Sequence, residues 1–143
     1  MDGTLFEKEI IDTIEIYLNK DLFQFYKRTS GTDLDKIQGT DFIYLGVRFD
    51  FTTNFNFKNK MKILKDVYYI PKLNLNIRFG IRYGNMYKRK YRIFDQPVLV
   101  FGYTSGIDTL WDTDIVLNIM KDYIIDIINR GVDIYQKTIL KYI

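Results

Sequence analysis

Asp41 and Asp50 are the residues of this sequence whose type and spacing are best suited to chemistry. They fall in two short runs, 41–45 and 47–51, that are rich in aromatic and aliphatic residues. Gly46 separates the runs, a pattern that predicts a β-hairpin. Two carboxylates on neighbouring strands could bind one divalent cation, which would polarise a phosphodiester and lower the pKa of a bound water. The alternative is structural: Asp41 would accept hydrogen bonds in a turn, and Asp50 would be a solvated strand residue.

The residue types that are missing restrict the chemistry further. The chain has no cysteine and no histidine, which excludes disulfides, thiolate nucleophiles, histidine bases and the usual zinc sites. A metal site could therefore use only oxygen ligands, which suit Mg²⁺ and Mn²⁺. The sequence also lacks the motifs of phosphate-binding loops, dinucleotide-binding folds and nucleophile elbows.

An amphipathic helix precedes the hairpin. Apolar residues at three- and four-residue spacings predict a helix over residues 5–25, followed by a polar loop at 27–35. After the hairpin, 55–70 is ambiguous between strand and helix, 73–79 alternates as a strand, and 97–103 has the apolar character of a buried central strand. From residue 109 the spacing predicts a helix, which Gly131 could end, and 132–143 fits a further helix or a final strand.

This order of elements predicts a single α+β domain over residues 1–143. It would contain an N-terminal helix, a central mixed β-sheet of four to five strands, and one or two C-terminal helices. No apolar run reaches the ~20 residues of a membrane span, and the N-terminus lacks the features of a signal peptide. We therefore expect a cytoplasmic protein with no membrane partner. Acids at the start of the last helical region are interpreted as favourable helix N-terminal charges, with a metal site as the alternative: Asp108, Asp112 and Asp114.

The hairpin resembles the PD-(D/E)xK nuclease-like superfamily. The similar segments are Gly39-Thr40-Asp41-Phe42 and, after a short turn, Val47-Arg48-Phe49-Asp50-Phe51-Thr52. Members of the family show an acidic residue at the end of one strand and an acid-x-Lys motif on the next, with an amphipathic helix before them. The resemblance implies a restriction-endonuclease-like fold and, in an active member, cleavage of nucleic acid with Mg²⁺ or Mn²⁺.

Carried over to this sequence, the resemblance implies that Asp41 and Asp50 are catalytic metal ligands. Thr52 stands where the family has its lysine, and a threonine cannot supply the charge that stabilises the attacking hydroxide and the phosphate. The resemblance also places a helix glutamate at the site and Gln38 near the DNA. The candidates for the glutamate are Glu7, Glu9 and Glu15. The family's helix after the third strand is missing from the predicted order of elements.

Because of Thr52, the first interpretation is a degenerate and catalytically inactive site. The alternative is an active metal-dependent nuclease whose lysine has migrated to Lys58, Lys60 or Lys62. Lys58 falls on the same strand face as Thr52, but six further residues of continuous strand would displace it by ~20 Å. A bulge or turn after Thr52 would be needed to bring its ammonium back to the carboxylates.

Basic residues are concentrated in the middle of the chain. Residues 58–92 contain eleven Lys or Arg residues and one acid, hence a charge of +10, whereas the whole chain carries +3. This asymmetry predicts a polyanionic partner, and basic residues interleaved with tyrosines suit contacts to nucleic acid. The alternative is a solvated hairpin that binds nothing. The candidate nucleic-acid contacts form the densest stretch, Tyr87, Lys88, Arg89, Lys90 and Arg92.

The sequence therefore predicts an inactive nuclease-like protein that binds nucleic acid or a nucleic-acid-processing complex and needs no cofactor. One alternative is the nuclease with a migrated lysine, which would use Mg²⁺ or Mn²⁺. Another is a protein-binding inhibitor or accessory domain from a phage or other mobile element, since Tyr and Arg are favoured in protein interfaces.

Overall fold

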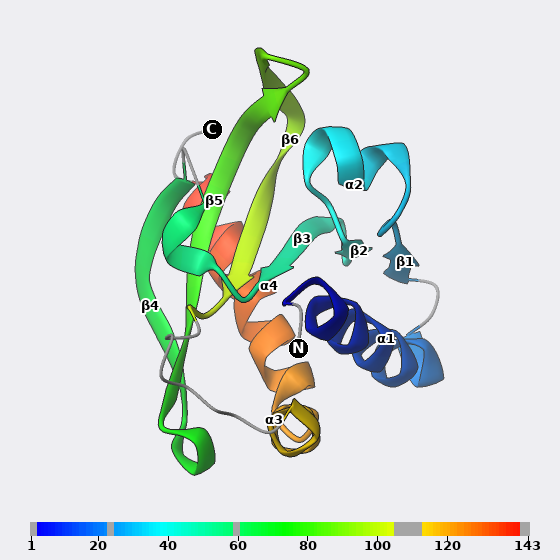
Figure 1. Cartoon of the computed structure of the whole chain (residues 1–143), viewed down its shortest axis with the longest axis vertical. Coiled ribbons are helices and arrows are strands. Elements are labelled where there is room, and N and C mark those ends of the chain that lie inside the picture. Colours follow the sequence, from blue (N-terminus) through cyan, green and yellow to red (C-terminus); the bar gives the residue numbers. More distant parts are fainter. Residues whose placement is uncertain (1–2, 23–24, 59–60, 105–112, 141–143) are drawn as a thin grey trace.

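The computed structural model describes residues 3–22, 25–58, 61–104 and 113–140, which form an α+β arrangement (Figure 1). The helices are α1 (Gly3–Leu22), α2 (Asp33–Gln38), α3 (Thr113–Met120) and α4 (Ile124–Leu140). The strands are β1 (Tyr26–Arg28), β2 (Phe42–Tyr44), β3 (Val47–Thr52), β4 (Met61–Ile70), β5 (Leu75–Tyr87) and β6 (Lys90–Gly102). Among the described residues, η2 (Phe55–Phe57) and η3 (Pro71–Leu73) are short 3₁₀ turns.

The strands form a single mixed sheet in the order β1-β2-β3-β6-β5-β4. Neighbouring strands are antiparallel except for β3 and β6, which are parallel. The apolar run 98–101 of β6 is at most 1% exposed and pairs with β3 on one side and β5 on the other. The prediction of a buried central strand at 97–103 is therefore confirmed, as is the α+β class, although the sheet has six strands instead of four or five.

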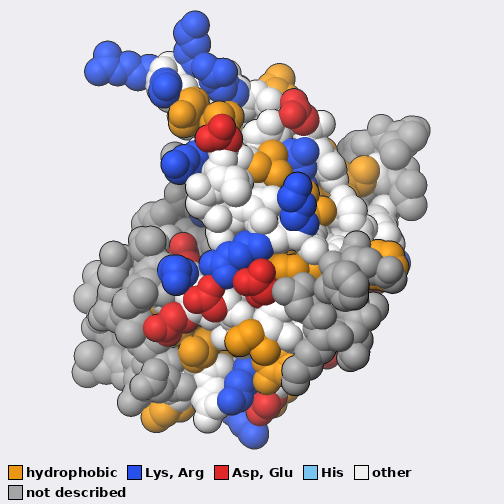
Figure 2. Space-filling model, turned by 90° about the vertical axis from the view of Figure 1, so that its right-hand side faces the viewer, with side chains coloured by type: hydrophobic (Ala, Val, Ile, Leu, Met, Phe, Trp, Pro, Cys, Tyr) orange, Lys and Arg blue, Asp and Glu red, His pale blue; other side chains and the backbone are white. Residues whose placement is uncertain are grey.

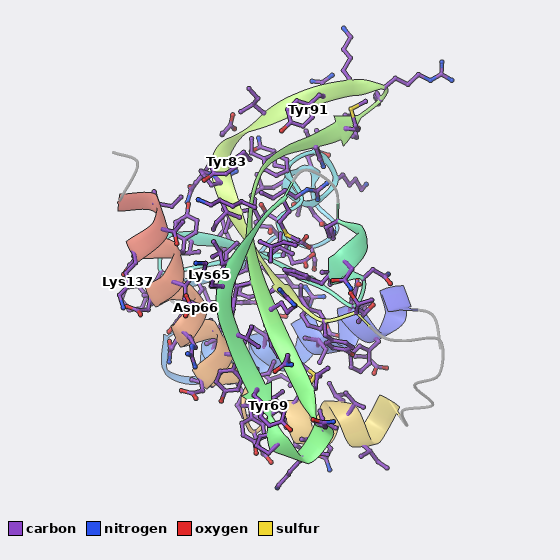
Figure 3. The ribbon with its side chains drawn as sticks, turned by 90° about the vertical axis from the view of Figure 1, so that its left-hand side faces the viewer. Lys65, Asp66, Tyr69, Tyr83, Tyr91 and Lys137 are labelled. Carbon is purple, nitrogen blue, oxygen red and sulfur yellow. The ribbon has the colours of Figure 1, made fainter. Side chains whose placement is uncertain are left out.

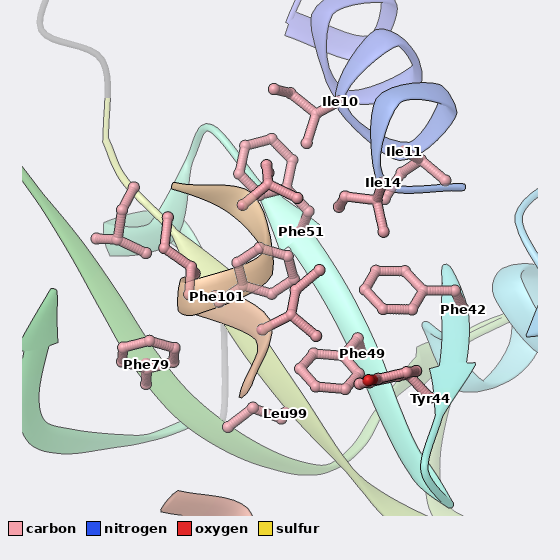
Figure 4. Close-up of a cluster of buried hydrophobic side chains, with 14 of the residues drawn as sticks. Ile10, Ile11, Ile14, Phe42, Tyr44, Phe49, Phe51, Phe79, Leu99 and Phe101 are labelled. Atoms are coloured by element: carbon pink, nitrogen blue, oxygen red, sulfur yellow. The ribbon is translucent and has the colours of Figure 1, made fainter. Parts of the chain in front are cut away.

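The main core lies between the sheet and the helices α1, α3 and α4. Phe42 and Phe49 stack with their ring centroids 4.9 Å apart, and Phe101 meets both rings edge-on (Figure 4). Gly131 lies where α4 packs closely on the sheet, because a Cβ there would be 2.8 Å from Leu99 Cδ2. Of the two possibilities that the sequence left open, the helix does not end at Gly131: α4 continues through the glycine, which allows the close packing.

The opposite face of the sheet carries Asp50. Paired residues in a ladder project to the same side of a sheet, so Asp50 shares its row with Val100 of β6. The adjacent row on this face consists of Arg48, Val98 and Arg82. The two valines are fully buried and the two arginines are partly buried. This face therefore presents a carboxylate beside two guanidinium groups.

Two short elements occur where a polar loop was predicted at 27–35. β1 forms an edge strand by pairing with β2, and α2 ends at Gly39, which adopts a left-handed conformation with φ 56°. Elements of three and six residues carry too few apolar residues for a periodic signal, so their neighbours stabilise them. In the predicted acidic cluster, Asp108 and Asp112 lie outside the described residues. Within the described ranges, no helix is long and apolar enough to cross a membrane.

Candidate functional site

The two predicted carboxylates lie side by side. β2 pairs with β3 through Phe42 and Phe49, and extending this register by one residue on each strand places Asp41 opposite Asp50. The backbone fixes Asp41 in two ways. Its N–H donates to the Phe49 carbonyl at 2.8 Å, and its Oδ2 accepts a hydrogen bond from the Phe51 N–H at 2.9 Å. One oxygen of Asp41 thus accepts a backbone hydrogen bond, but from strand β3 and not within a turn, and the hairpin also brings the carboxylates together.

The environment of this pair favours the protonated form of Asp41. Burial raises the pKa of Asp41 well above its usual range, and the adjacent Asp50 carboxylate raises that pKa further. The Phe51 N–H opposes the shift, and Asp35 adds a smaller repulsion. Two carboxylates in contact are unfavourable when both are ionised, so the pair attracts either a proton or a cation.

Lys58 supplies a cation to this pair. Its Nζ lies 3.1 Å from Asp50 Oδ2, and the Asp50 side chain is only 8% exposed, so Asp50 is not a solvated strand residue. The ammonium approaches without hydrogen-bond geometry, and Asp50 Oδ2 is buried with no hydrogen-bond donor among the described residues. The Lys58 ammonium is therefore the cation that faces this buried oxygen.

A turn after β3 brings Lys58 back to Asp50. β3 ends at Thr52, and η2 follows at Phe55. Phe55 is fully buried and its N–H donates to the Tyr103 carbonyl at 3.2 Å, which anchors the turn. The Lys58 N–H then donates to the Phe55 carbonyl at 3.3 Å. The ~20 Å displacement expected for a continuous strand does not arise, because the chain reverses within these residues.

Thr52, which stands at the family's lysine position, has a structural role. It is 2% exposed, and its Oγ1 accepts a hydrogen bond from the Asn54 N–H at 3.0 Å. That bond stabilises the first step of the turn that leads to Lys58. Thr52 is not among the described residues that line the adjacent pocket.

A pocket of about 440 Å³ opens beside the carboxylates. Its wall combines acids and bases from α1, the β1–α2 region, β3 and the turn after it, and Figure 2 shows acidic and basic side chains together near the middle of one face. The sequence alone did not indicate Arg28 or Asp35 as site residues, because neither stands at a spacing that matches a known motif. The charged residues of the wall are Glu7, Lys8, Arg28, Asp35, Asp41, Asp50 and Lys58.

The structure distinguishes the three candidate glutamates of α1. Glu7 lines the pocket, and its Oε1 accepts hydrogen bonds from the Thr53 N–H at 2.9 Å and from Thr53 Oγ1 at 3.2 Å. Glu15 instead forms an ion pair with Arg28 at 3.0 Å. Glu9 is not among the described residues that line the pocket. Glu7 is therefore the helix glutamate of the site, and it holds the backbone where the chain leaves β3.

Gln38 lies outside the pocket, in a network at the end of α2. Its Oε1 accepts from Arg48 Nη1 at 2.7 Å and from the Asp95 N–H at 3.0 Å, while its Nε2 donates to Asp95 Oδ2 at 2.8 Å. The network connects α2 to β3 and β6. In this structure Gln38 fixes Arg48, and the expected position near DNA stays a prediction.

The predicted nucleic-acid contacts do not join the carboxylates. They occupy the β5–β6 hairpin turn, which projects at one end of the molecule (Figure 1). The sequence thus contains two separate basic features: Lys58 with Arg28 at the pocket, and the exposed hairpin.

The donor set of the pocket fits a hard divalent cation. Mg²⁺ typically binds through one or two carboxylates and keeps water or substrate oxygens as its other ligands. Asp41 and Asp50 provide two adjacent carboxylates, and Asp50 Oδ2 is the buried acceptor without a donor. Within the described part of the chain, no three His, Cys, Asp or Glu side chains are grouped so that they alone could hold a metal ion. Asp41 and Asp50 are therefore the two side chains that could hold Mg²⁺ or Mn²⁺.

Comparison with protein-family models, with curated proteins and with solved structures finds no match for this chain.

Proposed function

We propose that the pocket is the active site of a divalent-metal-dependent phosphodiesterase that cleaves nucleic acid. The observation that carries this proposal is the 3.1 Å approach of Lys58 Nζ to the buried Asp50, beside Asp41. The inactive interpretation depended on the missing charge at Thr52. A lysine that reaches the same carboxylate by way of a turn supplies that charge, and the resemblance of the hairpin to the PD-(D/E)xK superfamily supports the same reaction.

Four charged side chains of the pocket have roles in this reaction. Asp41 and Asp50 would hold the cation, which when bound lowers the pKa of a water and offsets phosphate charge. Lys58 places a positive charge where an attacking oxygen and a phosphate would gain negative charge. Glu7 acts indirectly, because its bonds to Thr53 position the start of the turn that carries the lysine.

The proposal is tested by replacing Lys58 with methionine and measuring cleavage of labelled DNA and RNA with Mg²⁺ or Mn²⁺. Loss of one oxyanion donor costs about 3–4 kcal/mol, so by analogy Lys58→Met should cleave on the order of 10²–10³-fold more slowly. Asp50→Asn should also lose activity, because it removes a proposed metal ligand.

Lys8→Met is the matched control. Lys8 lines the same pocket, but its Nζ pairs with Asp12 at 3.5 Å and its side chain is 66% exposed. This variant changes the pocket charge by the same amount and should keep cleavage within a few-fold of wild type. Cleavage that survives Lys58→Met, or a wild-type protein that binds nucleic acid but cuts none with either metal, would contradict the proposal. The second outcome would restore the inactive interpretation.

A further inference from the structure

The β5–β6 hairpin extends beyond the other strands as a two-stranded ribbon. The pairing of β4 with β5 reaches no further along the hairpin than Arg82, and β3 pairs with β6 only over residues 98–102. β5 and β6 continue alone from the pair Gly84 and Ile93 to the pair Tyr87 and Lys90. At about 3.3 Å per residue, the ribbon and its turn project ~15 Å. Figure 3 shows this hairpin, with Tyr91 labelled, standing clear at one end of the molecule.

The turn of the ribbon uses residues that its backbone disfavours. Lys88 and Arg89 both have positive φ, 50° and 65°. Two-residue hairpin turns with positive φ at both central positions favour Asn-Gly or Gly-Gly, because a Cβ is strained there. Strain of this kind indicates function when the side chains themselves are needed. Two exposed cations at the tip, where glycine would be more stable, therefore indicate a binding role.

The two faces of the ribbon differ chemically. Alternation and cross-strand pairing place polar and basic residues together on one face and Met86, Tyr91 and Ile93 on the other. On the polar face, Tyr87 organises the cations, with Lys88 Nζ 5.4 Å and the Arg92 guanidinium 5.6 Å from its ring centroid. Residues 83–93 contain four Lys or Arg residues and no acid. The polar face consists of Asn85, Tyr87, Lys90 and Arg92.

We propose that this ribbon is an arm that enters the major groove of duplex DNA and holds the duplex for the phosphodiesterase site. The major groove of B-form DNA is about 12 Å wide and about 8.5 Å deep and admits a two-stranded β-ribbon. With its polar face towards the floor, a ~15 Å ribbon is long enough to cross the groove, so its tip meets the phosphates on the far side. Lys88 and Arg89 at the tip and Lys90 beside them suit phosphates, and the exposed Arg92 carries a guanidinium that pairs with base edges.

Duplex RNA offers no equivalent site, because its major groove is too deep and narrow for side chains to read. The chemistry of the arm thus selects B-form DNA as the substrate class. The inference rests on the proposed function for the presence of a nucleic-acid substrate. Binding by the arm, however, does not require cleavage and is measured separately.

The test is fluorescence anisotropy of the full chain with a labelled duplex DNA, the matched duplex RNA and the single strands, in EDTA and over a series of salt concentrations. We expect duplex DNA to bind at least about tenfold more tightly than the other nucleic acids. Lys88→Glu/Lys90→Glu should weaken binding by at least about tenfold. It should also make the negative slope of log K against log salt shallower by about 2, one for each phosphate that the arm no longer neutralises.

A matched control reverses two lysines away from the arm, one on β4 and one in η3. Lys65, labelled on β4 in Figure 3, and Lys72 are both exposed, so Lys65→Glu/Lys72→Glu makes the same change in net charge. Equal losses in the two double variants would overturn the arm, because they would show a general charge effect. Preference for single strands or duplex RNA would also overturn it. If cleavage is absent or survives Lys58→Met while binding still depends on the arm, only the proposed activity is contradicted and the arm stands.

Two further variants test the geometry. Lys88→Asn/Arg89→Gly supplies the favoured turn sequence, so it should leave Tm unchanged or raised while still weakening duplex binding. Arg92→Ala should weaken binding and Ile93→Ser should not, because Arg92 is exposed on the polar face and Ile93, 78% exposed, lies on the opposite face. The reverse result for Arg92 and Ile93 would overturn the assignment of the polar face to the groove.

Discussion

Replacing Asp41 with asparagine should stabilise the protein and at the same time remove its response to divalent cations. The substitution keeps an oxygen that can accept from the Phe51 N–H, which Asp41 Oδ2 now accepts at 2.9 Å. It removes a carboxyl whose pKa is raised by burial and by the adjacent Asp50. An amide can also donate to the Asp50 carboxylate, so above the folded-state pKa, where both acids are ionised, Asp41→Asn replaces their repulsion with a hydrogen bond.

The sign of the pH dependence follows from the raised pKa. Above the usual value of 3.8, the unfolded chain has released the Asp41 proton while the folded protein still binds it. The free energy of unfolding therefore decreases as pH rises from there through the folded-state pKa. Other groups that face Asp41, namely Asp50, Asp35 and Lys58, remain in the variant. Asp41→Asn should thus flatten this part of the pH profile in EDTA.

The size of the metal response can be worked out for a chain of this length. A cation at 100 times its Kd stabilises the folded state by about 2.7 kcal/mol. With about 2.1 cal/mol/K of unfolding entropy per residue, 143 residues give about 3 °C of Tm for each kcal/mol. Saturating Mn²⁺ should therefore raise the wild-type Tm by about 9 °C. The same addition should leave Asp41→Asn nearly unchanged.

Differential scanning calorimetry across a pH series, with EDTA or with Mn²⁺, measures both effects. Asp33→Asn is the control, because Asp33 is an exposed acid of α2 and the charge change is the same. An identical pH slope in wild type and Asp41→Asn, or an equal rise in Tm with Mn²⁺, would refute the coupled pair as a cation site.

Two further predictions concern the framework of the site. Arg28→Ala should destabilise the protein, because the Arg28 guanidinium lowers the pKa of Asp12 and stabilises the folded state. That stabilisation is lost as pH falls, so the variant should flatten the acid side of the profile of unfolding free energy against pH. Urea unfolding at two pH values measures this, and Arg28→Lys should restore only part of the stability because lysine lacks the forked donor geometry of a guanidinium. Phe49→Ala should lower the free energy of unfolding by about 3–5 kcal/mol, because the ring is fully buried against Phe42 and Phe101. Chemical denaturation measures this, and a loss below about 1 kcal/mol would contradict the packing of Phe49 in the core.

The elements with strong periodicity were predictable from the sequence. The first helix was expected at 5–25 and occupies Gly3–Leu22, and the strand expected at 47–51 occupies Val47–Thr52. Both bury one face against a single core, so the pattern of apolar residues records the packing directly. β1 and α2 were not predictable, because each is held by its partners: β1 by three pairs with β2, and α2 by the bonds of Gln38 to Arg48 and Asp95.

The carboxylate pair was predictable because it depends only on the hairpin register. Asp41 and Asp50 are brought together by adjacent strands, and alternation correctly placed Thr52 on the same face as Asp50. The choice of Glu7 among the three glutamates required tertiary structure, since its partner, Thr53, lies 46 residues away in the chain.

The position of the lysine depends on contacts that no local pattern contains. β6 runs so close to the end of β3 that a Cβ on Gly102 would lie within 1.9 Å of the Thr52 carbonyl oxygen. That oxygen then accepts from the Tyr103 N–H at 3.1 Å, and Asn54 forms a bridge with Thr104. These contacts end β3 and fold the chain into η2, so the spacing between Asp50 and its lysine is set by β6, about fifty residues away in the sequence. A motif defined by a fixed spacing assumes that the strand continues. Where a neighbouring strand ends it, the same ammonium reaches the same carboxylate from a different position in the sequence, which is why Thr52 alone is a poor criterion for inactivity.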